Sequence, residues 1–191
     1  MSRDNLKSII LTVLLMAVFI FSYLYTKKDR NYHAFSQTVQ TPSGEKRFSD
    51  ITNGKPSLLY FGFLNCPDAC PTTFSMMSRV FKELEPGDLD KFNFVFIDLD
   101  PERDTMERLI SYSSYFHPKI LPVVVPLKDL DAFTRFFGIA FMKVKLESTM
   151  SYTIDHSVDV VVLSKEGKFL ELLHHDAPKT VVLKRIKDLI K

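Results

Sequence analysis

The sequence predicts an α/β domain built on a mixed β-sheet and preceded by a single transmembrane helix, and three observations support this fold class. Short apolar runs with the length of buried strands alternate with amphipathic segments, as in parallel βαβ units. A hairpin pattern and a last amphipathic segment follow them. A long apolar segment without charge, Pro or Gly occupies Ser8–Thr26, near the N-terminus.

The apolar segment Ser8–Thr26 is about as long as a helix must be to cross the hydrocarbon core of a membrane. Tyr23 and Tyr25 stand near its end, where interfacial aromatic residues are common. A cleaved signal peptide is the alternative, but no small-x-small cleavage site follows the segment. We therefore expect residues 1–28 to be a cytoplasmic tip and an uncleaved anchor, although the flanking positive charges do not fix its orientation.

Length and composition limit the function classes. The chain has 191 residues, which suits one domain with extensions, and its formal net charge is only +2. No long run of Lys or Arg is present, so we expect no nucleic-acid partner. The only cysteines are Cys66 and Cys70, which are too close together to staple a fold. Their proximity indicates metal or redox chemistry.

The segment before the domain, residues 29–56, is polar, and we expect a tether with a short hairpin around Thr41–Gly44. The folded domain, residues 57–191, is expected to begin with a buried strand at the apolar run Ser57–Phe63. Apolar residues then recur at helical spacing over Thr72–Glu85, and a Pro-Gly pair ends that helix.

The middle of the domain repeats the strand–helix alternation. A second strand is expected at Phe92–Asp98, and Asp104 can cap a helix that begins at Thr105. Two prolines keep the third strand, Leu121–Leu127, short or at an edge of the sheet. The helix Leu130–Phe137 follows, with a glycine suited to its C-terminal cap.

The last third contains a hairpin and a helix. Val158–Leu163 and Lys168–Leu173 flank a turn that contains glycine, and Pro178 opens the last helix. The complete order is a parallel βαβ unit, a further βα element, an antiparallel hairpin and a helix. This order predicts a thioredoxin-like three-layer α/β/α domain with a mixed sheet.

The strongest chemical motif is CPDACP at Cys66–Pro71, directly after the first strand and before the first helix. Positive charge at a helix N-terminus stabilises a thiolate, which is the form that attacks disulfides and binds metals. Residues four apart on one helical turn can direct both sulfur atoms to one point. The pair alone leaves redox and metal chemistry open.

His156 favours the metal interpretation. It lies just before the strand Val158–Leu163, and in a thioredoxin-like fold the loop entering that strand faces the cysteine turn. Two soft thiolates and one imidazole suit copper. A structural zinc site usually has four protein ligands, and no further cysteine is present. We therefore expect a copper site made by Cys66, Cys70 and His156.

Two other groups of polar residues are expected to be structural. In Asp98–Thr105 (DLDPERDT), caps and an Asp–Arg salt bridge would order the turn after the second strand, and carboxylates bind cuprous copper poorly. His174 and His175 are neighbours, and neighbours in a strand point to opposite faces of the sheet. These two histidines are therefore not expected to share a metal.

The ordered motifs resemble the Sco/SenC family, copper proteins of cytochrome c oxidase assembly. The resemblance is carried by YFGF at Tyr60–Phe63, then CPDACP, then DLDPERDT, then YTIDHS at Tyr152–Ser157. It implies that Cys66, Cys70 and His156 bind copper as Cu(I), with Cu(II) left open. It also implies a metallochaperone that helps mature the copper centre of cytochrome c oxidase subunit II.

The alternative function is a membrane-anchored thiol–disulfide reductase acting on the cysteines of subunit II, so enzymatic activity stays open. A peroxidase of the peroxiredoxin type is disfavoured, because Phe63 and Pro67 stand where that class needs Thr or Ser. The implied partners are subunit II and a copper-donor chaperone. The resemblance implies a periplasmic domain on a single-pass anchor in a bacterial inner membrane.

Overall fold

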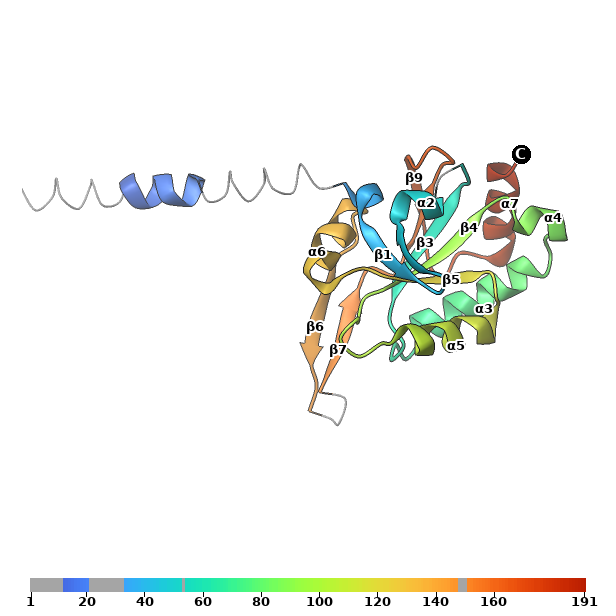
Figure 1. The fold of residues 1–191 in the computed structure, drawn as a ribbon. Helices are drawn as coiled ribbons and strands as arrows, with labels where there is room; N and C mark the ends of the chain where they lie inside the picture. The colour runs from blue at the N-terminus through green and yellow to red at the C-terminus, as the bar shows by residue number, and fades with distance from the viewer. Residues whose placement is uncertain (1–11, 21–32, 53, 148–150) are drawn as a thin grey trace, which may run out of the picture. The chain divides into compact units, whose positions relative to one another are not determined.

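The computed structural model describes residues 12–20, 33–52, 54–147 and 151–191 (Figure 1). Ala34–Lys191 form one compact unit, and Met1–His33 form a separate one. Of the expected anchor, residues 12–20 are helical and the rest lies outside the described residues. Within the described part of the chain, no helix combines the length and the apolar character needed to cross a membrane.

The compact unit is built on a seven-stranded sheet made of β1 (Thr38–Thr41), β2 (Gly44–Arg47), β3 (Ser57–Gly62), β4 (Asn93–Asp98), β5 (Ile120–Val124), β8 (Val160–Leu163) and β9 (Phe169–Leu173). The order across the sheet is β2-β1-β5-β4-β3-β8-β9. β3, β4 and β5 are parallel, and antiparallel strands extend the sheet on both sides. β3 is buried along its whole length, which explains its continuous apolar sequence.

Helices cover both faces of this sheet: η1 (Ala34–Ser36, a 3₁₀ helix), α2 (Phe48–Thr52), α3 (Ala69–Phe81), α4 (Pro86–Leu89), α5 (Met106–Phe116), α6 (Leu127–Phe136) and α7 (Lys179–Leu189) (Figure 1). α3, α5 and α7 pack on the face that carries the Tyr60 side chain. On the opposite face, Phe61 contacts Phe137 at the end of α6, and Phe48 contacts Phe133. A mixed sheet between two helical layers confirms the expected thioredoxin-like architecture.

The folded unit begins earlier than the expected start at Ser57. The hairpin expected around Thr41–Gly44 is present as β1 and β2, but β1 also pairs with β5 and so joins the main sheet. Phe48 is fully buried. The polar composition of this segment does not indicate a strand of the main sheet, because only alternate residues of β1 are buried. The expected tether therefore ends before Ala34.

A second, two-stranded sheet lies between α6 and β8 in the chain, where no strand is expected. β6 (Phe141–Lys145) and β7 (Tyr152–His156) form this antiparallel pair. Gly138, with a φ of 72°, follows α6 and redirects the chain. β6 is largely exposed, and β7 is mostly half-buried, so neither strand shows the regular alternation of buried and exposed residues that marks a strand in the sequence. The last residue of β7 is His156, so this hairpin positions a predicted metal ligand.

Phe48→Ala tests whether the residues before Ser57 belong to the folded domain. The Phe48 ring is fully buried against Phe133, so we expect the free energy of unfolding to fall by about 3–5 kcal/mol. Tyr115→Ala is the control, because Tyr115 is 84% exposed and its truncation should change stability by less than about 0.5 kcal/mol. Chemical denaturation of the full chain measures both. Equally small effects would show that this segment only tethers the domain.

Candidate metal centre

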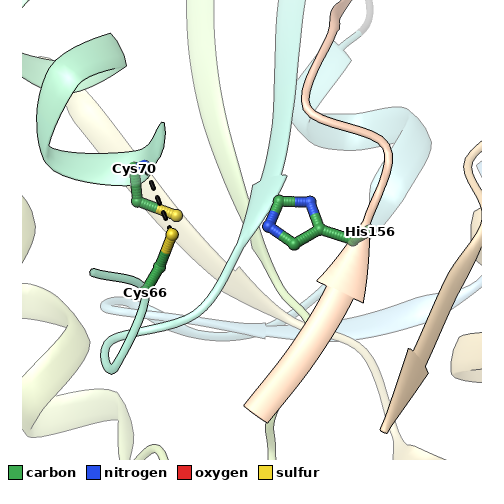
Figure 2. Close-up of side chains that lie close together, drawn as sticks. All are labelled: Cys66, Cys70 and His156. Atoms are coloured by element: carbon green, nitrogen blue, oxygen red, sulfur yellow. Dashed lines mark hydrogen bonds between the residues drawn. The ribbon is translucent and has the colours of Figure 1, made fainter. Parts of the chain in front are cut away.

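The structure brings together the three residues expected to bind a metal (Figure 2). Cys66 lies in the turn after β3, Cys70 lies in the first turn of α3, and His156 ends β7. The two Sγ atoms and a ring nitrogen of His156 all lie within 4.8 Å of one another. Figure 2 shows the imidazole of His156 pointing toward the two cysteines. Two segments that are distant in the sequence, the cysteine turn and the end of β7, therefore meet at one point.

The two thiols of this site differ in burial and in acidity. The hydrogen bond from the Cys70 thiol lowers the pKa of Cys66 to about 4, and partial burial opposes this only in part. The backbone N–H of Cys70 also donates to Cys66 Sγ, at 3.4 Å. The hydrogen bond to Cys66, together with burial, raises the pKa of Cys70 well above its ordinary value. At neutral pH, Cys66 is a thiolate and Cys70 is a thiol.

Two residues of β3 fix the position of the Cys70 sulfur. The Tyr60 hydroxyl donates a hydrogen bond to Cys70 Sγ at 3.7 Å, and burial raises the pKa of that hydroxyl so far that it remains a donor. At Gly62, a Cβ atom would lie only 2.5 Å from Cys70 Sγ. Sequence reasoning assigned neither residue to the site, because both belong to an apolar run with the pattern of a buried strand.

The His156 ring is held in one orientation and one tautomer. Its Nδ1 lies 2.9 Å from the carbonyl oxygen of Ser157, which can only accept, so in the neutral ring Nδ1 carries the proton and donates. Nε2 then keeps the lone pair that a metal requires. Phe63 contacts the imidazole, with ring centroids 5.9 Å apart and planes at 80°. A carbonyl acceptor of this kind typically orients histidine ligands in metal sites.

The segment Asp98–Thr105, which we call the acidic loop, connects the two halves of the site. Asp104 accepts a hydrogen bond from the backbone N–H of Leu64, in the cysteine turn, at 2.8 Å. Asp100 accepts a hydrogen bond from the hydroxyl of Tyr152, at the start of β7, at 2.7 Å. The acidic loop therefore braces the cysteine turn against the strand that carries the histidine. Sequence reasoning did not identify Tyr152 as a supporting residue.

The expected roles within the acidic loop are partly confirmed and partly wrong. The expected Asp–Arg salt bridge is present between Asp100 and Arg103. Thr105, and not Asp104, caps α5, because its side chain accepts a backbone hydrogen bond from the first turn. Burial raises the pKa of Asp98 to about 8, so this carboxyl is largely protonated at neutral pH. None of these carboxylates belongs to the group of three ligand atoms.

The donor set determines what the site can do. Two sulfur ligands and one imidazole favour copper, whereas a structural zinc site usually has a fourth protein ligand. A thiolate beside a thiol can also exchange with a disulfide. The site therefore fits a copper ion and also fits dithiol chemistry. Fold and site together define a thioredoxin-like domain with a metal centre of two cysteines and one histidine.

Comparison with known sequences identifies the family. The SCO1/SenC family model matches residues 26–191, so the chain belongs to the SCO1/SenC family, as its motifs suggest. It is 33% identical over 147 residues to an SCO2-like protein of Rickettsia prowazekii, covering 76% of this chain and 71% of that protein. It is 30% identical over 138 residues to the mitochondrial SCO1 homolog of Homo sapiens, covering 72% of this chain and 45% of that protein.

Solved structures share the fold. Apo Sco1 from Thermus thermophilus matches with a TM-score of 0.71 at 30% identity, over 80% of this chain and 89% of that chain. ScoI of Bradyrhizobium japonicum, solved with copper bound, matches with a TM-score of 0.72 at 26% identity, over 80% of this chain and 96% of that chain.

The reduced, metal-free protein should contain one thiolate at neutral pH. Because the pKa of Cys66 is about 4, the ultraviolet absorbance of its thiolate should persist at pH 7 and disappear only as the pH falls through about 4. Cys66→Ser should remove this absorbance. Cys70→Ala should raise the pKa of Cys66, because it removes the strongest hydrogen bond to the thiolate. A wild-type signal that titrates near the ordinary thiol value of about 8.5 would contradict the proposed asymmetry.

Gly62→Ala should displace the Cys70 sulfur, because the added Cβ would lie 2.5 Å from it. We expect binding of Cu(I) to weaken at least ~10-fold, the lower end of the loss when the support of a metal ligand is disturbed. Competition with a chromophoric Cu(I) chelator measures the affinity. Gly87→Ala is the control, since no atom of the described residues lies within 4 Å of a Cβ at that position. An unchanged affinity in Gly62→Ala would show that Cys70 can shift without loss of binding.

Proposed function

We propose that this protein is a copper-binding assembly factor that helps mature the copper centre of cytochrome c oxidase subunit II. The observation that carries the proposal is the approach of Cys66 Sγ, Cys70 Sγ and a His156 ring nitrogen to within 4.8 Å of one another. Proteins of the same fold from Bradyrhizobium japonicum, Arabidopsis thaliana and yeast have been solved with copper bound. Copper is the cargo in this proposal, and the three side chains would hold it before transfer.

The protonation states of the cysteines suit the binding of Cu(I), which prefers soft ligands. Cys66 is already a thiolate and needs no deprotonation, whereas Cys70 is protonated and must lose its proton to bind the metal as a thiolate. Loading with copper at neutral pH would therefore release about one proton from the cysteine pair. Binding of Cu(II) should be measured alongside binding of Cu(I).

The exposure of the ligands suits transfer of the metal to a partner. Cys70 is buried, but Cys66 and His156 are partly exposed. A hollow of about 170 Å³ borders His156, and Phe141 and Met142 line it as well. Met142 is 61% exposed. Incoming ligands of subunit II would reach the exposed side first and replace His156 and Cys66 before Cys70.

A thiol–disulfide reductase acting on the cysteines of subunit II is the second candidate, and the asymmetry of the two thiols favours it. The Cys66 thiolate would attack a substrate disulfide, forming a mixed disulfide and releasing one substrate cysteine as a thiolate. Cys70, after losing its proton, would attack the Cys66 sulfur and release the second substrate cysteine. The protein would end as the Cys66–Cys70 disulfide, and the substrate would gain two electrons.

We also propose that the domain lies in the periplasm, on a single-pass anchor in a bacterial inner membrane. The support is the apolar sequence of Ser8–Thr26, which has the length of a membrane-spanning helix. In that compartment the domain would receive copper from a donor chaperone and meet subunit II.

His156→Ala separates the two candidate functions. It removes the imidazole, so copper affinity should fall by ~100-fold or more, while both thiols remain available for disulfide exchange. In a strain that lacks the native protein, we expect His156→Ala to fail to restore oxidase activity. Cys66→Ser and Cys70→Ser should fail under either function. His117→Gln, a histidine outside the site, should restore activity.

Two outcomes would count against the copper-binding assembly function. Restored oxidase activity by His156→Ala, with copper affinity lost, would favour the reductase. Unchanged copper affinity in the same variant would overturn the three-ligand site.

A further inference from the structure

A second group of metal-ligating side chains occurs among the described residues. Ligand atoms of Asp159, His174 and His175 all lie within 4.8 Å of one another. None of these residues takes part in the proposed copper function, so a role for this group is independent of that function.

The antiparallel pairing of β8 and β9 brings these residues together. Val160 pairs with Leu173, so Asp159, just before β8, comes next to His174, just after β9. β9 ends at Leu173, and the chain then turns, with the N–H of Ala177 donating to the carbonyl of His174 at 2.9 Å.

The expectation that His174 and His175 point to opposite faces is therefore wrong. Strand geometry does not apply to them, because both lie in the turn after β9. Their ring centroids are 4.8 Å apart, with planes at 40°. Neighbouring histidines can thus direct nitrogen atoms to one point.

Asp176 fixes the tautomer of His174. Its carboxylate accepts a hydrogen bond from His174 Nδ1, so Nε2 keeps the lone pair. This Nε2 lies 3.9 Å from Asp159 Oδ1. One metal ion can span that separation, since zinc–nitrogen and zinc–oxygen bonds are each about 2 Å long. A carboxylate behind a histidine ligand is a common arrangement in metal sites.

Two ligand atoms of this cluster are buried and lack a hydrogen-bond partner among the described residues. Asp159 Oδ1 and His175 Nδ1 make no hydrogen bond within the part of the chain that the structure describes. Buried polar atoms are nearly always paired, so each such atom needs an explanation. A cation bound between them would provide a partner for both.

We propose that Asp159, His174 and His175 form a second metal site that binds a divalent first-row cation of the Zn²⁺ or Cu²⁺ type. Two imidazoles and one carboxylate suit such ions, whereas Cu(I) prefers the thiolates of the first site. Asp176 acts as a positioning residue, because it orients His174 without contacting the ion. Three protein ligands leave at least one coordination position for water.

Zinc titration of the full chain in detergent tests the proposal. The background carries Cys66→Ser and Cys70→Ser, which removes the thiolates of the first site. A chromophoric chelator competes for the zinc and reports the affinity. We expect the background to bind about one Zn²⁺ per chain. His174→Gln or Asp159→Asn should lower the affinity at least ~100-fold. Asp176→Asn leaves all three ligands in place and should weaken binding by about 10–100-fold.

His117→Gln in the same background is the matched control and should bind zinc unchanged. Zinc should also raise the melting temperature of the background and leave that of His174→Gln unchanged. If a ligand variant fails to fold, Asp176→Asn still decides, because the Asp176 side chain is 72% exposed and its loss should not disturb the core. The absence of zinc binding by the background, or binding that Asp159→Asn and Asp176→Asn leave intact, would overturn the proposal.

Discussion

The contact between the sulfur atoms of Cys66 and Cys70 is the constraint on which the rest of the site depends. The hydrogen bond to Cys66, together with burial, keeps Cys70 protonated, and the same hydrogen bond keeps Cys66 ionised. This arrangement requires a short turn, residues 63–68, between a buried strand and a helix. It also requires glycine at position 62, because a Cβ there would occupy the space of the sulfur. The packing of β3 against α3 thus sets the chemistry of both thiols.

The third ligand, His156, belongs to the two-stranded sheet. Its position relative to the cysteines therefore depends on contacts other than the hydrogen bonds of the main sheet. The acidic loop supplies them, because Asp104 contacts the cysteine turn and Asp100 contacts the start of β7. Buried carboxylates are unfavourable unless paired or protonated. Arg103 pairs with Asp100, and Asp98 is largely protonated at neutral pH. The loop therefore orders the site without adding a hard ligand to it.

Local sequence patterns locate the ligands but not the residues that support them. The spacing of apolar residues predicts the strand before Cys66 and the helix after it. His156 is predicted because it lies in the loop that, in a thioredoxin-like fold, faces the cysteine turn. Tyr152 was missed because it reaches Asp100 across 52 positions, a contact that neither segment encodes locally. The expectation for His174 is wrong for another reason: β9 ends at Leu173, so strand geometry no longer applies in the turn that follows.

The two clusters share one short segment of chain, since Asp159 lies only three residues after His156. The two clusters differ in their ligands and so in the metals they prefer. The thiolates of the first favour Cu(I), and the imidazoles and carboxylate of the second favour a divalent ion. A divalent ion at the second cluster would therefore not displace Cu(I) from the first. It would instead hold the backbone around Ser157, whose carbonyl fixes the tautomer of His156. Any coupling that results must be reciprocal, so copper at the first site would change the affinity of the second by the same factor.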